Sequence, residues 1–367
     1  MLLTVPASFF TAEAAEDRTA LVSKTRFYDS AGRSITVEKP FARIISLYPA
    51  HTENLFSLGL DKEIVGVSRS DDYPAAATGK KRYSSHDGPE KFLAGKPDLV
   101  LVRPMIDRGY APLIERLEQF GVVVVSLQPS NAEQMFEYWK ILGILTGKSK
   151  QAENMIEAFQ GRLAKIRSMV SRIDHQKRKK VYFEAIHSRM KTFSPGAMPV
   201  FALKEAGGIN LAEDADSVRN TNIAYFGKER ILSLAGEIDV YLAQRGAMND
   251  ATIEAIRNEP GFSVIKAIRN KNIHLIDEKL VSRPTMRLLE GITEIGRILH
   301  PEVFTDAAVS EILSGLASTA AIPFVVTALA VRPPTAKAVT TNVPLLQKQS
   351  GLEAMRPPLA KPSLQTG

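Results

Sequence analysis

The side chains most able to do chemistry are scattered, and their spacing matches no catalytic motif. The chain has six histidines and no cysteine, which excludes a disulfide framework, a thiolate nucleophile and a Cys-ligated metal. It also lacks the H-E-x-x-H, G-x-S-x-G and G-x-G-x-x-G patterns. Gly147-Lys148-Ser149 looks like the end of a phosphate loop, but Leu142 stands where the first glycine is needed. We therefore predict no catalytic residue and no resident metal or cofactor.

Composition describes a soluble globular chain of two domains. Its 367 residues are 44% hydrophobic and 24% charged, which is ordinary for such proteins. The net charge of +7, from 47 basic and 40 acidic residues, is mild and dispersed. It does not indicate a nucleic-acid partner.

Both ends of the chain carry unusual segments. Leu2–Phe10 is mostly apolar and Ala12-Glu13-Ala14 follows it; this is typical of an export signal whose basic start is missing, or of an ordinary N-terminus. The uncharged residues 312–331 suit either a membrane anchor or an apolar helix packed on the body. The proline-rich residues 332–367 favour a disordered tail.

Seven short apolar runs in the body predict strands that are buried on both faces. Helical segments such as Thr52–Leu58, Ala111–Phe120 and Met198–Ala206 lie between them. This alternation predicts an α/β fold with largely parallel sheets. The runs are Arg43–Leu47, Ile64–Val67, Asp98–Val102, Val122–Leu127, Val181–Phe183, Ile238–Ala243 and Ile273–Ile276.

The alternation stops once, between Asn131 and Ile173, where two helices are expected instead. Ala132–Leu145 forms the first, and Lys148–Ile173 forms a longer one with an amphipathic stripe. The architecture predicted is two Rossmann-like α/β lobes joined by a single long helix. The expected segments are an N-terminus (1–24), a first lobe (25–146), the bridging helix (147–174), a second lobe (175–304) and a tail (305–367).

An ordered series of short motifs carries a family resemblance over about 280 residues. The first motif is a D-x-x-G-R hairpin at Asp29–Arg33. The second is a strand-to-helix turn at Ser46–Glu53. Further motifs are residues 64–67, 72–74, 96–100 and 206–210, and a helix start at Arg287. The series resembles the periplasmic substrate-binding proteins of ABC importers for ferric siderophores, haem and cobalamin, of the helical-backbone type.

The resemblance implies a monomeric, non-catalytic binding protein that is periplasmic or extracytoplasmic. It would deliver a metal chelate, bound between the lobes, to an ABC transporter permease. The implied ligand-contacting residues lie on loops that follow the strands and on the last helix. They are His51, Arg69, Tyr73, Arg103, Tyr110, His187, Phe193, Arg245, Arg283 and Arg287.

Residue type suggests how these side chains would act. Tyr73, Tyr110 and Phe193 could stack on a flat chelate, and arginines could hold carboxylates or catecholates. Each arginine could equally be a surface charge. The family's cobalamin binders carry cleft tryptophans, whereas Trp139, the single tryptophan here, lies inside a predicted helix. Together with Arg103, which stands where such a binder has an aromatic residue, this favours an anionic ferric chelate or haem.

Two acidic residues match permease-docking glutamates of the family. Glu90 and Glu229 each open a short predicted helix, one in each lobe. A carboxylate is electrostatically favoured at that position in any case. The resemblance implies that both meet basic residues of the permease.

Two alternative functions remain open at this stage. A receptor for a bare zinc or manganese ion would need converging ligands, for which His51, His187 and Asp71 are available. A chelatase-like enzyme on a related two-lobed fold would need a residue placed for proton transfer.

Overall fold

The computed structural model describes residues 25–218 and 221–315. The apolar N-terminal segment, and residues 316–331 of the uncharged stretch with the tail that follows, lie outside the described residues. The description begins with an antiparallel hairpin of β1 (Thr25–Tyr28) and β2 (Ser34–Val37). Asp29, in the turn between them, accepts hydrogen bonds from the backbone N–H groups of Ala31 and Arg33.

The N-terminal lobe is built on a five-stranded, fully parallel sheet. Its strands, in spatial order, are β5 (Arg82–Tyr83), β4 (Ile64–Ser68), β3 (Ile44–Ser46), β6 (Leu99–Val102) and β7 (Val123–Ser126). The four apolar runs predicted here are all strands. Neighbouring residues of one strand enter different cores: Ile44 packs with Leu55, and Ile45 packs with Leu117. Burial of both sheet faces explains why these runs are apolar throughout.

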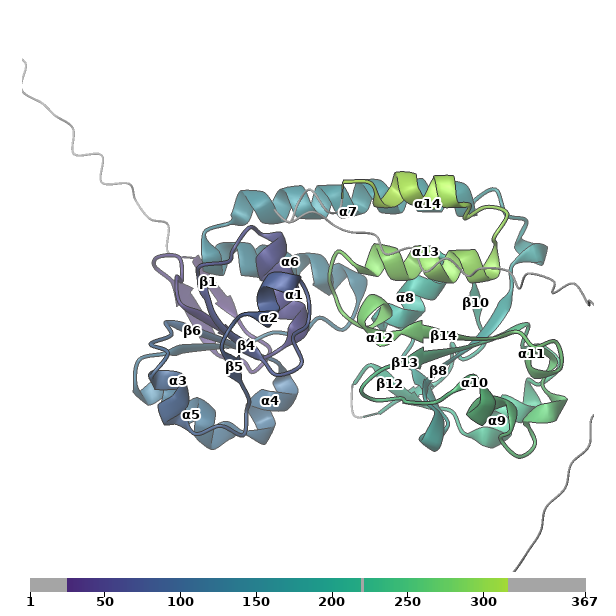
Figure 1. The fold of residues 1–367 in the computed structure, drawn as a ribbon, viewed down its shortest axis with the longest axis horizontal. Helices are drawn as coiled ribbons and strands as arrows, with labels where there is room; N and C mark the ends of the chain where they lie inside the picture. The colour runs from purple at the N-terminus through teal and green to yellow at the C-terminus, as the bar shows by residue number, and fades with distance from the viewer. Residues whose placement is uncertain (1–24, 219–220, 316–367) are drawn as a thin grey trace, which may run out of the picture. The chain divides into compact units, whose positions relative to one another are not determined.

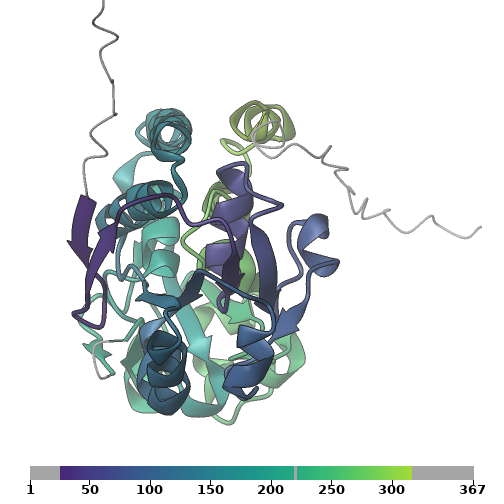
Figure 2. The same cartoon turned by 90° about the vertical axis from the view of Figure 1, so that its left-hand side faces the viewer.

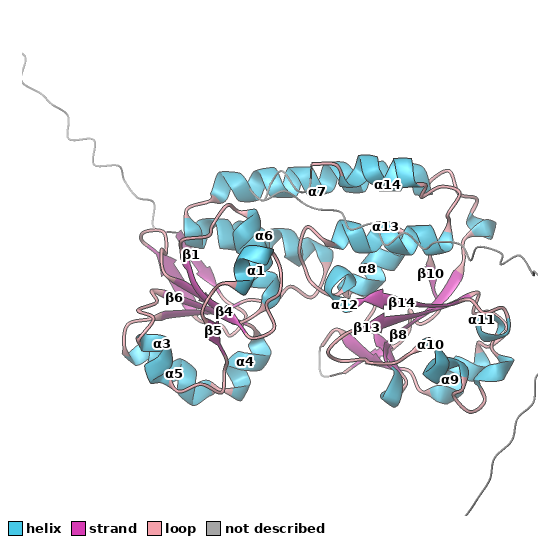
Figure 3. Cartoon of the chain, in the orientation of Figure 1, coloured by secondary structure: helices cyan, strands magenta, loops and turns pink. Residues whose placement is uncertain are grey.

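Helices cover both faces of this sheet, as Figure 3 shows. They are α1 (Pro49–Ser57), α2 (Ala75–Thr78), α3 (Pro89–Leu93), α4 (Pro104–Gly109), α5 (Ala111–Gln119) and α6 (Ala132–Thr146). Proline occupies the first or second position of α1, α3, α4 and α5. Its fixed φ and missing N–H suit a helix start, so these prolines help to set where the loops after the strands end.

The C-terminal lobe holds a mixed sheet. Its order is β11 (Asp216–Ser217), β12 (Ile223–Tyr225), β9 (Lys191–Phe193), β8 (Lys180–Ile186), β13 (Val240–Arg245) and β14 (Ile273–Asp277), and β10 (Ile209–Asn210) also pairs with β8. The three predicted runs are β8, β13 and β14, which are parallel to one another.

The prediction of largely parallel sheets is wrong for one edge of the C-terminal lobe. A short 3₁₀ turn at His187–Arg189 and the left-handed Met190 (φ 46°) return the chain directly into β9. A connection this short can only produce an antiparallel neighbour. Strands β11 and β12 continue that antiparallel edge; both are short and partly exposed, so no apolar run marks them in the sequence.

The helices of the C-terminal lobe are mostly short. They are α8 (Met198–Glu205), α9 (Lys228–Ser233), α10 (Ile253–Arg257), α11 (Lys266–Arg269), α12 (Glu278–Val281), α13 (Leu288–Leu299) and α14 (Asp306–Leu313). The amphipathic α13 buries residues such as Ile292 and Ile295 against α8 and β14.

One uninterrupted helix, α7 (Ser149–Val170), leads from the first lobe to the second, as Figure 1 shows. It packs on α6 in the N-terminal lobe and on α8, α13 and α14 in the C-terminal lobe. Phe159 stands edge-on to Trp139 of α6, with ring centroids 5.5 Å apart, and is fully buried. The predicted amphipathic stripe of α7 is therefore part of the core of both lobes.

The folded body extends beyond the predicted boundary at residue 304. Helix α14 buries Val309 and Ile312, and Arg162 Nε donates to the Ile312 carbonyl at 3.0 Å. Figure 2, which looks nearly along the helix axes, shows α14 beside α7. The tail therefore cannot begin at residue 305, and Ile312 belongs to the core. Among the described residues, no helix has the length and apolar character needed to cross a membrane.

Candidate functional site

The N-terminal sheet has one point where its strand order reverses. From β3 the chain builds β4 and β5 on one side, and then β6 and β7 on the other. Where the loops after two neighbouring strands run in opposite directions, a crevice opens at the carboxyl ends of the strands. Ligands of α/β proteins bind in such a crevice. Tyr48 follows β3 and Arg103 follows β6, and the Arg103 guanidinium lies 5.1 Å from the Tyr48 ring centroid. The reversal point is thus marked by a cation stacked on an aromatic ring.

The C-terminal sheet reverses between β8 and β13. The chain after β8 turns to β9 and β10 on one side, and only later adds β13 and β14 on the other. His187 follows β8, and Arg245 ends β13 with its side chain exposed. Both lobes therefore present an arginine where topology favours ligand binding. Neither Arg103 nor Arg245 is in an ion pair with any residue of the described ranges.

The predicted arginines of the last helix region lie against the N-terminal lobe. Arg283 Nη1 is 2.5 Å from Glu53 Oε1 of α1 and 3.9 Å from Asp72 Oδ1. Lys279 of α12 also pairs with Asp72. Burial raises the pKa of Glu53, although Arg287 and Arg283 act in the opposite direction. Arg283 is itself buried, so its charge is committed to this contact.

Arg287 lies beside the same acid in a looser arrangement. Its Nη1 is 3.8 Å from Glu53 Oε1, its Nε is 3.7 Å from Glu290 Oε1, and its guanidinium lies 4.3 Å from the Tyr73 ring centroid. Its buried Nε has no hydrogen-bond partner. This pair of predicted residues, Tyr73 and Arg287, is brought together from different lobes.

A second contact between the lobes is neutral. The Pro284 carbonyl accepts hydrogen bonds from Asn54 Nδ2 at 2.9 Å and from Trp139 Nε1 at 3.0 Å. Trp139, the single tryptophan, therefore lies at the junction between α6 and the C-terminal lobe, where it is fully buried.

Two predicted residues belong to the core and not to a ligand surface. His51 is fully buried; Nε2 lies 3.0 Å from the Val102 carbonyl and Nδ1 lies 2.7 Å from the Tyr138 hydroxyl. A carbonyl only accepts, so Nε2 carries the proton and Nδ1 accepts from Tyr138. Burial lowers the pKa of His51 to about 4. Phe193 is 1% exposed and packs edge-on against Phe183 at 4.9 Å. These two predictions are corrected, because both side chains face inward.

Arg69, Tyr110 and His187 are at least partly accessible. Arg69 is exposed and pairs with Asp87 at 3.2 Å. The Tyr110 hydroxyl lies 2.8 Å from His86 Nε2. His187 is 13% exposed at its side chain, and its Nδ1 lies 2.9 Å from Glu184 Oε2.

Glu90 and Glu229 occupy matching positions in the two lobes. The sequences are Gly88-Pro89-Glu90-Lys91-Phe92-Leu93 in α3 and Gly227-Lys228-Glu229-Arg230-Ile231-Leu232 in α9. In each, a glycine N-cap precedes the helix and the fifth residue is fully buried. The basic residue after each glutamate is ion-paired at 2.6 Å, Lys91 to Asp87 and Arg230 to Asp214. The two glutamates are exposed and form no ion pair within the described ranges.

The residues considered as ligands of a bare metal ion, His51, His187 and Asp71, do not form a metal site. The described residues contain no group of three or more His, Asp or Glu side chains that could hold one. His51 is buried with both nitrogens occupied, and burial raises the pKa of Asp71, which disfavours its carboxylate form.

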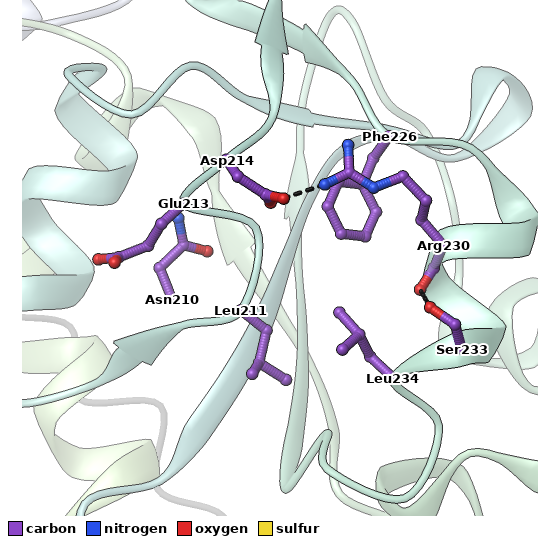
Figure 4. A pocket seen from close by; sticks show the side chains of 8 residues that line it. All are labelled: Asn210, Leu211, Glu213, Asp214, Phe226, Arg230, Ser233 and Leu234. Carbon is purple, nitrogen blue, oxygen red and sulfur yellow. Dashed lines mark hydrogen bonds and ion pairs between the residues drawn. The ribbon is translucent and has the colours of Figure 1, made fainter.

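A pocket of about 450 Å³ lies elsewhere in the C-terminal lobe. Figure 4 shows the ion pair of Arg230 with Asp214 on one side and the apolar Leu211 and Leu234 on the other. None of the predicted ligand residues lines it. The pocket lies at α9 and the end of β10, not at the strand reversal, so we place the candidate site at the reversal points.

Sequence reasoning missed the acids that hold the predicted basic residues. In the sequence, Glu53 stands out only as part of the Thr52-Glu53 motif, and Asp72 only as part of residues 72–74. Glu184, which directly follows the predicted run Val181–Phe183 and lies within β8, carries no motif, and neither does Glu259. A charged residue within a buried strand is the available signal for Glu184.

The chain matches the family model of the periplasmic binding proteins over residues 44–280 and belongs to that family. It is 25% identical over 286 residues to an uncharacterised ABC transporter substrate-binding lipoprotein of Bacillus subtilis, covering 76% of this chain and 86% of that protein. It is 26% identical over 259 residues to a vitamin B12-binding protein of Vibrio campbellii, covering 70% and 88%.

Solved structures agree with this assignment. A possible iron-binding periplasmic solute-binding protein of Staphylococcus epidermidis superposes with a TM-score of 0.62 at 28% identity, covering 71% of this chain and 99% of that one. The vitamin B12-binding protein of Vibrio cholerae shares the fold, with a TM-score of 0.55 at 21% identity and coverages of 75% and 99%. The predicted family and two-lobed α/β fold are confirmed.

Proposed function

We propose that this protein binds an anionic metal chelate, a ferric siderophore or haem, and delivers it to an ABC importer. The observation that carries the proposal is the pair Arg103 and Arg245. Each follows a strand at the reversal point of its own sheet, and neither charge is neutralised by an ion pair among the described residues. Two such cations on facing lobes suit a ligand with carboxylate or catecholate groups.

Aromatic side chains complete this proposed surface. Tyr48 lies under Arg103, and Arg287 stacks over Tyr73. A flat chelate can stack on such rings while the guanidinium groups hold its charged edge. Relatives that bind vitamin B12 keep cobalamin as the second candidate ligand, and the same titration can test it.

Docking to the permease is assigned to Glu90 and Glu229. The support is their shared local structure, which pairs the neighbouring basic residue and leaves the glutamate exposed. An exposed rim charge steers and orients docking more than it holds ligand. This role places the protein outside the cytoplasmic membrane, as the lipoprotein relative suggests.

Trp139 offers a direct binding test. Its indole N–H donates across the lobe junction to Pro284, so a ligand that changes the junction will change its fluorescence. The purified protein is titrated with a ferric catecholate, a ferric hydroxamate, haemin and cobalamin, and native mass spectrometry identifies any ligand retained from the source. Saturable binding of an anionic chelate is expected. Binding of cobalamin alone, or of none of the four, would contradict the proposal.

A further inference from the structure

A chain of alternating charges runs from the core of the C-terminal lobe to the first turn of α9. Glu184, fully buried in β8, accepts hydrogen bonds from the Tyr241 hydroxyl and, at 2.9 Å, from His187 Nδ1. His187 Nε2 lies 3.8 Å from Glu259 Oε2. Lys228 Nζ, at the start of α9, donates to Glu259 Oε1 at 2.6 Å. Four charged groups thus alternate in sign when His187 is protonated.

Neighbouring groups hold His187 in this position. Its backbone N–H donates to Asn249 Oδ1 at 3.0 Å, and Asn249 Nδ2 lies 3.4 Å from Glu184 Oε1. The buried Phe262 ring lies 6.4 Å from the His187 ring and 5.9 Å from Lys228 Nζ. One apolar ring therefore lies beside both groups, and low-dielectric surroundings strengthen charge interactions.

We propose that Glu259 and Lys228 are positioning residues that couple the His187 loop at the end of β8 to helix α9, which carries Glu229. The inference rests on the proposed function, because it takes His187 as the ligand-contacting residue that the sequence predicts and Glu229 as a residue that docks to the permease. A ligand group that contacts His187 changes the charge that Glu259 faces. Glu259 also holds Lys228, so the first turn of α9 responds.

The electrostatics are consistent with this coupling. The hydrogen bond that His187 donates to Glu184 raises the pKa of His187. Burial opposes this shift, Glu259 raises the pKa further and Lys228 lowers it. The titratable groups facing His187 are thus Glu184, Glu259 and Lys228, with Tyr241 behind Glu184. Removing Glu259 should lower the pKa of His187, and removing Lys228 should raise it.

The test follows two signals in the isolated, full-length protein by NMR from about pH 5 to about pH 8, where histidine titrates. One signal is the His187 ring, and the other is the backbone amide of Glu229. In the parent protein, both should move with the same midpoint. In Glu259→Gln, the His187 ring should titrate at lower pH, and the Glu229 amide should no longer follow it.

Glu254→Gln is the matched control, since Glu254 is an exposed acid of the adjacent α10; the two midpoints should stay linked. If Glu259→Gln fails to fold, Lys228→Met replaces it, with a raised His187 midpoint expected, and Lys228→Arg should restore the link. The proposal is overturned if the Glu229 amide signal does not titrate with the midpoint of His187 in the parent protein. It is also overturned if that signal still does so in Glu259→Gln. This test uses neither ligand nor permease. Its outcome is therefore separate from that of the transport experiment, which tests whether Glu229 docks to the permease.

Discussion

Arg283 Nη1 and Glu53 Oε1 lie 2.5 Å apart although 230 positions separate the two residues in the sequence. Both side chains are buried, with 11% and 2% of their surface exposed. This ion pair fixes the start of the C-terminal helix region against α1 of the N-terminal lobe. The junction between the lobes therefore contains a buried polar contact, although the core around it is largely apolar.

Breaking this pair from one side should be costly. Arg283→Met leaves the Glu53 carboxylate buried without its nearest cation, and we expect a loss of about 3–5 kcal/mol of unfolding free energy. The double variant with Glu53→Met should lose much less than the sum of the single changes. Urea unfolding measures all three. Lys140→Met, which removes an exposed pair with Glu137, is the control and should cost under about 1 kcal/mol. Strict additivity would contradict a direct interaction.

Acidification should destabilise the protein through His51. Its pKa is lowered from 6.5 to about 4 in the folded protein, so the unfolded chain binds the proton first as pH falls. Stability that is fully present above about pH 6.5 is lost as pH falls towards 4, by about 3 kcal/mol at most. Unfolding free energies of the parent and of His51→Gln are compared across this range. The variant should show a shallower dependence than the parent. Parallel curves for parent and His51→Gln would refute the assignment.

Arg103 and Arg245 should act together on ligand affinity. Each alanine variant should weaken binding of an anionic chelate by about tenfold, because a hydrogen bond to a charged group is worth about 1.5–3 kcal/mol and water replaces part of it. Trp139 fluorescence titration gives the dissociation constants. Arg116→Ala in α5, exposed and stacked on Phe120, should leave affinity unchanged. Unaltered binding in both site variants would exclude these residues from the ligand surface.

Glu90→Ala and Glu229→Ala should leave ligand affinity unchanged but slow uptake through the transporter. Both carboxylates are exposed at helix starts, where they can meet a partner without touching the ligand. Uptake by cells that carry each variant is compared with binding by the purified protein. Glu133→Ala, an exposed acid at the equivalent position of α6, is the control. A double variant that transports at the parental rate would show that docking uses other residues.

Two glycines of the paired helices α6 and α7 should respond oppositely to alanine. Gly161 lies in the exposed middle of α7, with open space where an alanine Cβ would lie, so Gly161→Ala should stabilise the protein by up to about 1 kcal/mol. A Cβ on Gly143 of α6 would lie 2.8 Å from Ala152 Cβ and 3.1 Å from the Ser149 Cα of α7, so Gly143→Ala should destabilise it. Urea unfolding distinguishes the two signs. Stabilisation by Gly143→Ala would mean that α6 and α7 do not approach this closely.

Local sequence patterns were sufficient for much of the fold. The run Leu99–Val102 is apolar at every position because both faces of β6 are covered, and any such run has few alternatives to a central strand. The stripe of α7 predicted one long helix, and the structure has one. Family motifs placed Glu90 and Glu229 at the starts of helices, where they are found.

The direction in which a side chain points was decided only by tertiary packing. His51 occupies a motif position near a strand end, yet Val102 and Tyr138, far away in sequence, provide the partners that hold it in the core. Phe193 lies on a strand that sequence patterns did not reveal, and the hairpin after β8 turns it inward. The charge chain from Glu184 to Lys228 likewise depends on contacts between distant segments. Such contacts leave no local periodicity, because their energy comes from burial and charge pairing that exist only once the lobes have folded.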